Sequence, residues 1–415
     1  MKIKTRNRAI LLFLLSLTTL MATSQTQKQR VNKTIGHAET FVHKMARGHF
    51  DSTYVALPAH KWMVFVSGNG SYTKYHLRMP MFDDVTDWWN DLGMKEGYKE
   101  YPQMSDENVH TYDMNLHNST QSVSIGLAYQ TLRAKYTFNV SKGNDRQLSI
   151  ESLGSRFGFF LDYRHTKRMK GDMYDAAVGF ETVLDHNEWT ADQIIDKVTS
   201  PINATYNNYT IFHAQAHYVF NSKRFSYSAG RSASRIQLKS AGSPIALVDF
   251  YQSRTKFKKD FIIGENEKFK TWKFSLGGGY GYNWTPNAGK FLLHASVMPT
   301  VTLFSHSKHT TDVPLTAEAQ KNYYEKNNYT DYTDDMVEQA VQDNKKTLER
   351  VNSLVDATPK ITLNCTARFS ATWNIDSHYV LGAYGTYLYS HFANNKDYRI
   401  KEHDFNGSVF VGYRF

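Results

Sequence analysis

The sequence has 415 residues, of which 14% are aromatic, yet its mean hydropathy is only −0.54. Soluble cores seldom combine many aromatic residues with so polar an average, whereas strands that face lipid on one side and water on the other do. The net charge is +10, and it is +6 when the four basic residues among the first 24 are left out. The remaining basic residues are spread along the chain, which argues against a nucleic-acid-binding surface. Cys365 is the one cysteine, so no intramolecular disulfide can form.

The N-terminus has the features of a secretory signal peptide. Four basic residues precede an apolar stretch over residues 9–22, small residues follow it, and a polar run begins at Gln25. The apolar stretch is shorter than the roughly 20 residues of a membrane-spanning helix, so we expect residues 1–24 to be removed on export. Residues 25–60 are expected to form a periplasmic segment that is partly helical, because apolar residues recur there at helical spacing: Ile35, Ala38, Val42 and Met45.

Alternation of apolar and polar residues dominates residues 61–415. In the clearest pair of runs, on either side of Gln130 and Thr131, one parity is apolar and the other carries small or charged residues, among them Arg133 and Lys135. Because successive side chains of a strand point to opposite faces, this pattern predicts a hairpin with one apolar and one wet wall. Similar runs continue to the C-terminus, one of them over residues 225–238. They predict an all-β fold, a transmembrane antiparallel β-barrel of about twelve strands, within ten to fourteen.

Three long loops are expected, over residues 79–119, 167–208 and 305–359. Short turns and long loops should alternate along such a barrel, but between 167 and 208 they do not. Either Tyr174–Leu184 is an extra strand or one connection runs on the unusual side.

The last of these loops contains helical features. Asp335, Met336, Val337 and Glu338 resemble a capping box, and apolar residues then follow near helical spacing: Val337, Val341, Leu348 and Val351. We expect a helix whose apolar side packs over the barrel mouth, with the docking of a partner as the alternative.

The final strand ends on an aromatic residue. Tyr413 and Phe415 share the parity of the apolar residues before them, whereas Gly412 and Arg414 share the other parity. A last strand that stops on a C-terminal aromatic resembles the signal by which outer-membrane barrels are recognised for assembly. The barrel-assembly machinery is therefore an expected partner.

Catalytic and metal-binding patterns are weak in this sequence. The Gly-x-Ser-x-Gly pentad of serine hydrolases does not occur. His213 and His217 lie on one strand, where four residues separate them by about 13 Å, too far to share one ion. An acidic group at Asp83, Asp84, Asp87 and Asp91 fits a solvated loop better than a calcium site. We expect no catalytic residue, no metal and no cofactor.

The chain resembles a known family, the outer-membrane barrels grouped as domain of unknown function 4421. The resemblance is carried by five segments: Asp51-Ser52-Thr53-Tyr54-Val55, the run from Tyr218 to Tyr227 (YVFNSKRFSY), Lys239-Ser240-Ala241-Gly242-Ser243, the glycine-rich strand from Gly277 to Tyr282, and Val411-Gly412-Tyr413. It implies the location and architecture only. The family's activity is unassigned, and it supplies no catalytic residue.

Three functions fit an outer-membrane barrel of this size. The first is a narrow channel or carrier for a small solute, in which basic side chains would favour anions. The second is a structural or assembly barrel with a closed lumen, and the third is a lipid-modifying enzyme. About twelve strands are too few for a wide aqueous pore. The expected surroundings are outer-membrane lipid and lipopolysaccharide, and the candidate lumen-facing residues are Arg133, Lys135, His213, His217, Arg231 and Arg235.

Overall fold

The computed structural model describes residues 50–80, 111–140, 145–167, 169–175, 200–203, 207–257, 266–326, 328–355, 361–393 and 398–415. The chain divides into two units, Met1–Gly48 and His49–Phe415, and every described residue belongs to the second. The predicted signal peptide, the predicted N-terminal helix and the acidic group at residues 83–91 lie outside the described residues.

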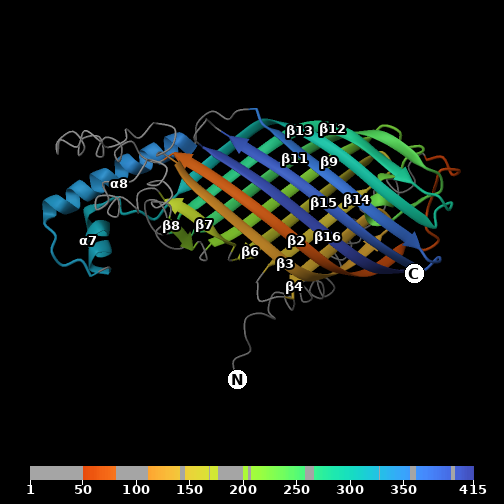
Figure 1. Ribbon diagram of the computed structural model, residues 1–415, viewed down its shortest axis with the longest axis horizontal. Coiled ribbons are helices and arrows are strands. Elements are labelled where there is room, and N and C mark those ends of the chain that lie inside the picture. Colours follow the sequence, from red (N-terminus) through yellow and green to blue (C-terminus); the bar gives the residue numbers. More distant parts are fainter. Residues whose placement is uncertain are drawn as a thin grey trace, which may run out of the picture. The chain divides into compact units, whose positions relative to one another are not determined.

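Twelve antiparallel strands form a closed ring, as predicted (Figure 1). The ring order is β2, β16, β15, β14, β13, β12, β11, β9, β6, β5, β4 and β3, and β3 pairs again with β2. The ring strands are β2 Trp62–Pro80, β3 Thr111–Tyr129, β4 Leu132–Asn139, β5 Arg146–Leu153, β6 Phe157–Lys167, β9 Asn207–Val219, β11 Ala241–Phe257, β12 Lys268–Trp284, β13 Phe291–Thr310, β14 Leu363–Asn374, β15 Tyr379–Ala393 and β16 Arg399–Arg414.

The outer face of the ring is apolar over a central band, whereas the inner face is polar at mid-lumen and carries apolar clusters nearer its ends. Val66 and Ile125 are paired across β2 and β3 and are 54% and 56% exposed, whereas their neighbours Ser67 and Ser124 are almost fully buried inside. A soluble protein buries its apolar parity instead, so this arrangement suits a ring surrounded by lipid. Exposed aromatic residues mark both ends of the outer apolar band: Trp62, Trp284, Trp373, Tyr379 and Tyr413 at one end, and Tyr72, Tyr387 and Phe405 at the other.

The two ends of the barrel differ. One end, called the turn end here, holds Phe415 and short connections, such as those at residues 285–290 and 375–378. The opposite end, the loop end, holds the hairpin of β7 Lys170–Asp175 and β8 Ser200–Asn203, which extends the sheet beside β3. No helix in the described part of the chain is long and apolar enough to cross a membrane.

The predicted set of wall strands was wrong in two places, and the two errors cancel in the total number of strands. Residues 225–238 are not a wall strand, and the ring contains β5, which the sequence reading did not identify. With these two changes, turns and loops alternate regularly, and the connection after β6 runs at the loop end. The expected connection on the unusual side is therefore wrong, whereas the alternative, an extra strand Tyr174–Leu184, lies outside the described residues after Asp175, where β7 ends beside the ring. Three strands also extend into the loops expected over residues 79–119 and 305–359: β2 ends at Pro80, β3 begins at Thr111 and β13 ends at Thr310.

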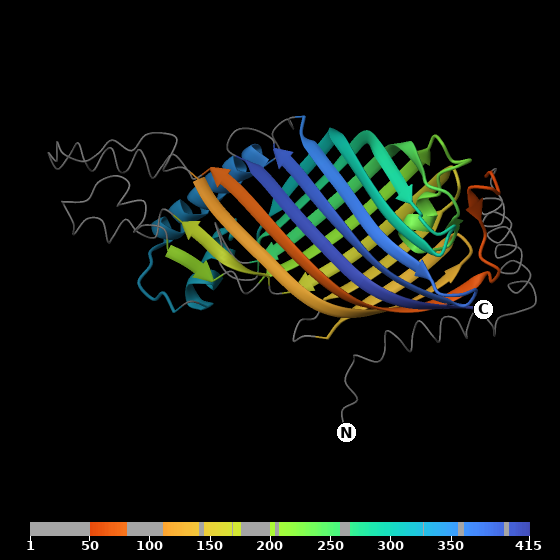
Figure 2. The ribbon, with the colours of Figure 1, turned by 45° about the vertical axis from the view of Figure 1, so that its right-hand side comes forward.

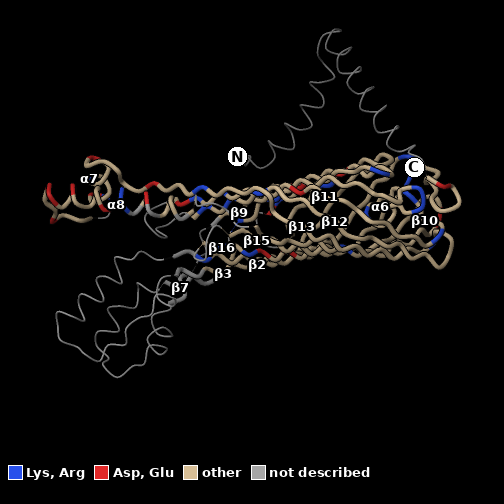
Figure 3. Tube along the Cα trace, turned by 90° about the horizontal axis from the view of Figure 1, so that it is seen from above, with Lys and Arg blue, Asp and Glu red and all other residues tan. Residues whose placement is uncertain are grey.

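The long loop contains two helices, α7 Ala317–Lys326 and α8 Asp334–Val355, of which only the second was predicted. They lie at the loop end and carry interspersed acidic and basic residues (Figure 3). The expected capping box at Asp335 was wrong, because the hydroxyl of Thr333 accepts the hydrogen bond from Met336 N at 3.3 Å.

Candidate functional site

A segment between β9 and β11 folds into the barrel and forms a plug. This plug, residues 220–240, contains α6 Tyr227–Ser232, whose N-cap Ser226 accepts a hydrogen bond from the backbone N–H of Ala229. In Figure 2, α6 lies within the ring near the end that holds the C-terminus. After α6, β10 Ile236–Gln237 pairs with β1 Val55–Ala56, so the plug is tied to the segment that precedes the barrel.

The side chain of Gln237 makes the hydrogen bonds that hold the segments of the plug together. Its side-chain N–H groups donate to three backbone carbonyls, those of Tyr54, Arg224 and Lys239, at 3.2, 2.6 and 2.8 Å. Its side-chain oxygen accepts from Ser226 N at 2.9 Å. An amide side chain can satisfy several buried backbone groups at once, which an irregular buried segment requires.

Three of the segments that carry the family resemblance meet around Gln237: Asp51–Val55, Tyr218–Tyr227 and Lys239–Ser243. The backbone N–H of Asp51 donates to the carbonyl of Lys223 at 2.8 Å, which joins the first segment to the second. Arg224 and Lys239 both lie over the ring of Tyr54, at 5.2 and 5.3 Å from its centroid. Hydrogen bonds from the Thr53 hydroxyl and the Thr53 N–H lower the pKa of the Asp51 carboxyl. The three segments are therefore one structural module.

The plug is also bonded to the barrel wall. Arg414 of β16 donates to the carbonyl of Ala233 at 2.9 Å, and Arg368 of β14 donates to the hydroxyl of Tyr227 at 2.6 Å. The plug therefore closes the turn end of the lumen.

Polar side chains join opposite walls at mid-lumen. Arg164 of β6 forms two hydrogen bonds with Asp404 of β16, at 2.7 and 2.9 Å, and the hydroxyl of Thr73 donates to the same carboxylate at 2.7 Å. Nearer the loop end, Tyr251 of β11 donates to Glu402 of β16. These contacts cross the lumen, because several strands separate β6 and β11 from β16 in the ring.

An apolar cluster closes the loop end. Val351 and Val355, near the C-terminus of α8, are buried among inward side chains of the ring. The cluster, called the loop-end cluster here, includes from the ring Tyr75, Leu77, Met114, Leu116, Tyr209, Ile211, Tyr251, Phe257, Phe269, Leu388, Phe392 and Ile400. The apolar side of the helix therefore packs on inward side chains of the ring, as expected.

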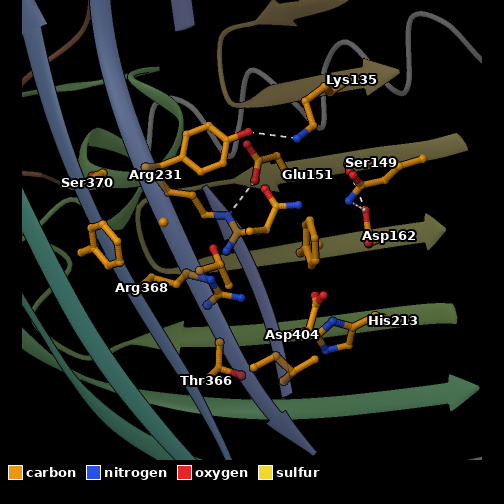
Figure 4. A pocket seen from close by; sticks show the side chains of 18 of the residues that line it. Lys135, Ser149, Glu151, Asp162, His213, Arg231, Thr366, Arg368, Ser370 and Asp404 are labelled. Carbon is orange, nitrogen blue, oxygen red and sulfur yellow. Dashed lines mark hydrogen bonds and ion pairs between the residues drawn. The ribbon is translucent and has the colours of Figure 1, made fainter. Parts of the chain in front are cut away.

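A cavity of about 110 Å³ remains between the plug and the mid-lumen contacts (Figure 4). Its charged lining residues are five basic side chains and three acidic ones: Arg133, Lys135, Arg164, Arg231 and Arg368, with Glu151, Asp162 and Asp404. Most of these charges are paired, for example Arg231 with Glu151 at 2.7 Å. The lining therefore carries an excess of positive charge.

Two guanidinium groups beside this cavity are incompletely satisfied. Arg368 bonds only neutral partners, Tyr227 and Gln215, and its Nε has no hydrogen-bond partner among the described residues. Arg133 lies 3.7 Å from Glu151, and its Nε and Nη2 likewise have no acceptor in this part of the chain. Buried N–H donors without acceptors cost free energy, so an anion in the cavity would compensate for them.

The predicted lumen-facing residues reach the interior in two ways. Arg133, Lys135 and His213 project from wall strands and line the cavity, and Arg231 lines it from the plug instead of from a strand. Lys135 donates to the hydroxyl of Tyr384 at 2.9 Å, so this lysine also joins two walls.

The other two predicted residues do not line the cavity. His217 packs edge-on against Tyr227, with ring centroids 4.7 Å apart. Arg235 is 2% exposed in the plug, near the ring of Phe50. His213 bonds Asp249 at 2.6 Å, so the two histidines have different partners. Within the described ranges, no group of three or more His, Cys, Asp or Glu residues is placed to hold a metal ion.

The sequence analysis missed three other residues that cross the lumen. Arg164, Arg368 and Asp404 lie on the inward parity of their strands, so their alternation could have identified them as lumen residues. Their partners could not be inferred in this way, because pairing across the ring depends on its closure.

The C-terminal aromatics lie on the outer face. Tyr413 and Phe415 are 41% and 52% exposed, and their rings stack at 6.2 Å. Phe415 exchanges backbone hydrogen bonds with Trp62 at 3.0 and 3.2 Å, so the pairing of β16 with β2 continues to the last residue.

Comparisons with solved structures return outer-membrane barrels at low identity. The protease OmpT of Escherichia coli has a TM-score of 0.33 at 7% identity, covering 86% of this chain and 97% of that chain. The β domain of the Bordetella autotransporter BrkA has a TM-score of 0.30 at 9% identity, covering 84% of this chain and 100% of that chain. The toluene transporter TodX of P. putida has a TM-score of 0.23 at 7% identity, covering 86% of this chain and 91% of that chain. Such values carry no functional conclusion.

Among curated proteins none matches this sequence. A family model, by contrast, matches residues 99–415, which is most of the chain, although the segment Asp51–Val55 lies before the matched part. The chain therefore belongs to the family described as domain of unknown function DUF4421.

Proposed function

We propose that the protein is an outer-membrane barrel that holds a small anionic solute inside a closed lumen. The outer apolar band with aromatic residues at both ends supports a location in a membrane. The short connections and Phe415 at the turn end support a periplasmic orientation of that end, with the loop end outside. In this arrangement the plug faces the periplasm.

The observation that carries the proposal is the buried charge of Arg368. This side chain lines the cavity, has only neutral hydrogen-bond partners and retains a free Nε–H among the described residues. An uncompensated buried charge costs several kcal/mol, roughly 3–5 where one partner of a buried pair is missing. A bound anion would lower this cost and would also satisfy Arg133.

The cavity limits the size and chemistry of the solute. Its volume of about 110 Å³ admits a phosphate ion or a short carboxylic acid. Arginine favours both anions because its planar fork matches their oxygen atoms. We therefore propose a small carboxylate or phosphate compound as the solute, and a narrow carrier as the function.

Calorimetric titration of the refolded mature chain with inorganic phosphate and with succinate tests this proposal. We expect saturable binding of at least one of the two, weakened about 10- to 100-fold by Arg368→Gln, because hydrogen bonds to charged groups contribute roughly 1.5–3 kcal/mol. The matched control is Arg156→Gln, which removes an exposed charge at the turn end. Equal binding by Arg368→Gln and the control, or no binding of either anion by the natural chain, would contradict the proposal.

A second candidate is a structural barrel with a permanently closed lumen. The contacts between Arg164 and Asp404 and between Lys135 and Tyr384 favour it, because they join the walls directly. Both candidates predict a silent lumen in planar bilayers, but only the first predicts anion binding. A steady large conductance of the natural chain would contradict both. The lipid-modifying activity and the role of Tyr413 and Phe415 in assembly stay predictions.

A further inference from the structure

The outer face of β11, β12 and β13 carries an unusual group of basic residues near the loop end. Arg254 of β11 is paired with Lys270 of β12, and Lys270 is paired with Lys308 of β13, so three cations stand side by side in one row across the sheet. In the next row toward the loop end, Lys256 is paired with Lys268. We call these five residues the basic rows.

Pairing within the sheet does not neutralise the basic rows. Side chains directly opposite each other on neighbouring strands lie about 5 Å apart, and like charges in such positions destabilise the pairing. Across β9, β11, β12 and β13, the remaining outward positions of these two rows are Asn208, Thr210 and Thr310, none of them acidic. Throughout the described ranges, no ion pair involves any of the five cations. The charge therefore lacks a counter-ion from the described protein.

The basic rows lie at a defined depth, immediately beyond the aromatic residues of the outer face. Trp272 is adjacent to Lys270 in the alternation of β12, and its ring stacks with Phe250 at 6.3 Å. From Trp272 to Trp284 at the turn end, the strand covers about 40 Å at roughly 3.4 Å per residue, which a tilt of about 40° reduces to about 30 Å across the membrane. This is the thickness of a hydrocarbon core, so the basic rows lie at the depth of the lipid headgroups.

From this placement we propose that the basic rows bind the phosphate groups of a glycolipid in the outer leaflet. Lys and Arg at headgroup depth attract anionic lipid, and several adjacent cations can share one multiply charged headgroup. Three residues of one row, Arg254, Lys270 and Lys308, are exposed to such a headgroup. The proposal is independent of the lumen and its solute.

The test measures the binding of a bisphosphorylated lipid A to the refolded mature chain in mixed micelles. The comparison ligand is the same glycolipid after enzymatic removal of its phosphates, and the glycolipid retained per barrel is counted by native mass spectrometry. The test variant is Arg254→Gln, Lys270→Gln and Lys308→Gln combined. The control variant is Lys61→Gln, Lys223→Gln and Lys290→Gln combined, which removes the same charge from exposed positions at the turn end.

We expect the natural chain and the control variant to retain the phosphorylated glycolipid, and the test variant to bind it about 100-fold more weakly. The magnitude follows from roughly fivefold per basic side chain at a charged membrane surface. Equal losses in both variants, equal binding of the dephosphorylated glycolipid, or unchanged binding by the test variant would overturn the proposal. If the test variant does not fold, as judged by heat-modifiable migration, the salt dependence of binding to the natural chain decides. Binding that does not weaken between 50 mM and 500 mM salt would then refute the proposal.

Discussion

Removing the carboxylate of Asp404 tests whether contacts across the lumen hold the barrel together. Asp404→Asn leaves Arg164 buried beside a neutral amide, since the two side chains are 10% and 13% exposed. Two short hydrogen bonds join the pair, at 2.7 and 2.9 Å, and a third comes from Thr73. An exposed pair contributes about 0–1 kcal/mol, whereas losing one partner of a buried pair costs roughly 3–5 kcal/mol. We expect a loss of about 3 kcal/mol in the free energy of unfolding.

Equilibrium unfolding by urea in lipid vesicles, followed by tryptophan fluorescence and extrapolated linearly, measures this loss. The double variant Arg164→Gln and Asp404→Asn should be more stable than Asp404→Asn alone, because no charge then remains unpaired. Asp334→Asn is the control, since its ion pair with Lys321 lies in solvent and should contribute less than about 1 kcal/mol. A loss below about 1 kcal/mol in Asp404→Asn, or a double variant less stable than the single one, would refute this account of the contact.

Three further variants test the closures and the wall. Gln237→Ala removes five hydrogen bonds from the plug, three donated by the side chain and two accepted by it, so we expect transient openings in planar bilayers, where we expect the natural chain to be silent; continued silence would count against the plug as the closure. Val351→Asp places a charge in the loop-end cluster and should speed proteolysis of the helical loop, whereas Met336→Asp, at an exposed position, should not. Gly279→Val would bring a Cβ within 1.8 Å of a backbone oxygen of β13 and should lower the yield of folded barrel on heat-modifiable gels, while Gly68→Val, with open space around it, should not.

Strand periodicity predicted the barrel because alternation is a local property. The outward exposure of Val66 and Ile125, and the inward position of Arg133 and Lys135, follow from parity alone. The glycines from Gly277 onward also lie inside a strand, as expected, where β13 approaches closely. The ring, its approximate strand number and the polarity of its two faces were therefore available from the sequence.

The plug was not available from the sequence, because its residues also alternate. Phe225 and Tyr227 share a parity that fits a wall strand, but both rings are fully buried inside the barrel, where they contact His294. The local sign of a helix was Ser226, an N-cap residue, and a helix of six residues gives too little periodicity to outweigh the strand pattern. Contacts across the lumen were equally hidden, since Arg164 and Asp404 are 240 residues apart in the sequence.

The plug gives the quoted family-like segments a physical reason to stay together. Residues that look unrelated in the chain meet around one side chain, because Gln237 binds the carbonyls of Tyr54, Arg224 and Lys239, which come from three different segments. A wall strand needs only the right parity at each position, whereas a buried irregular segment needs a specific partner for each backbone group. Substitution should therefore be tolerated less at the plug than along the lipid-facing wall. Because the plug lies at the turn end beside the basic cavity, any transport of a solute would depend on this part of the barrel.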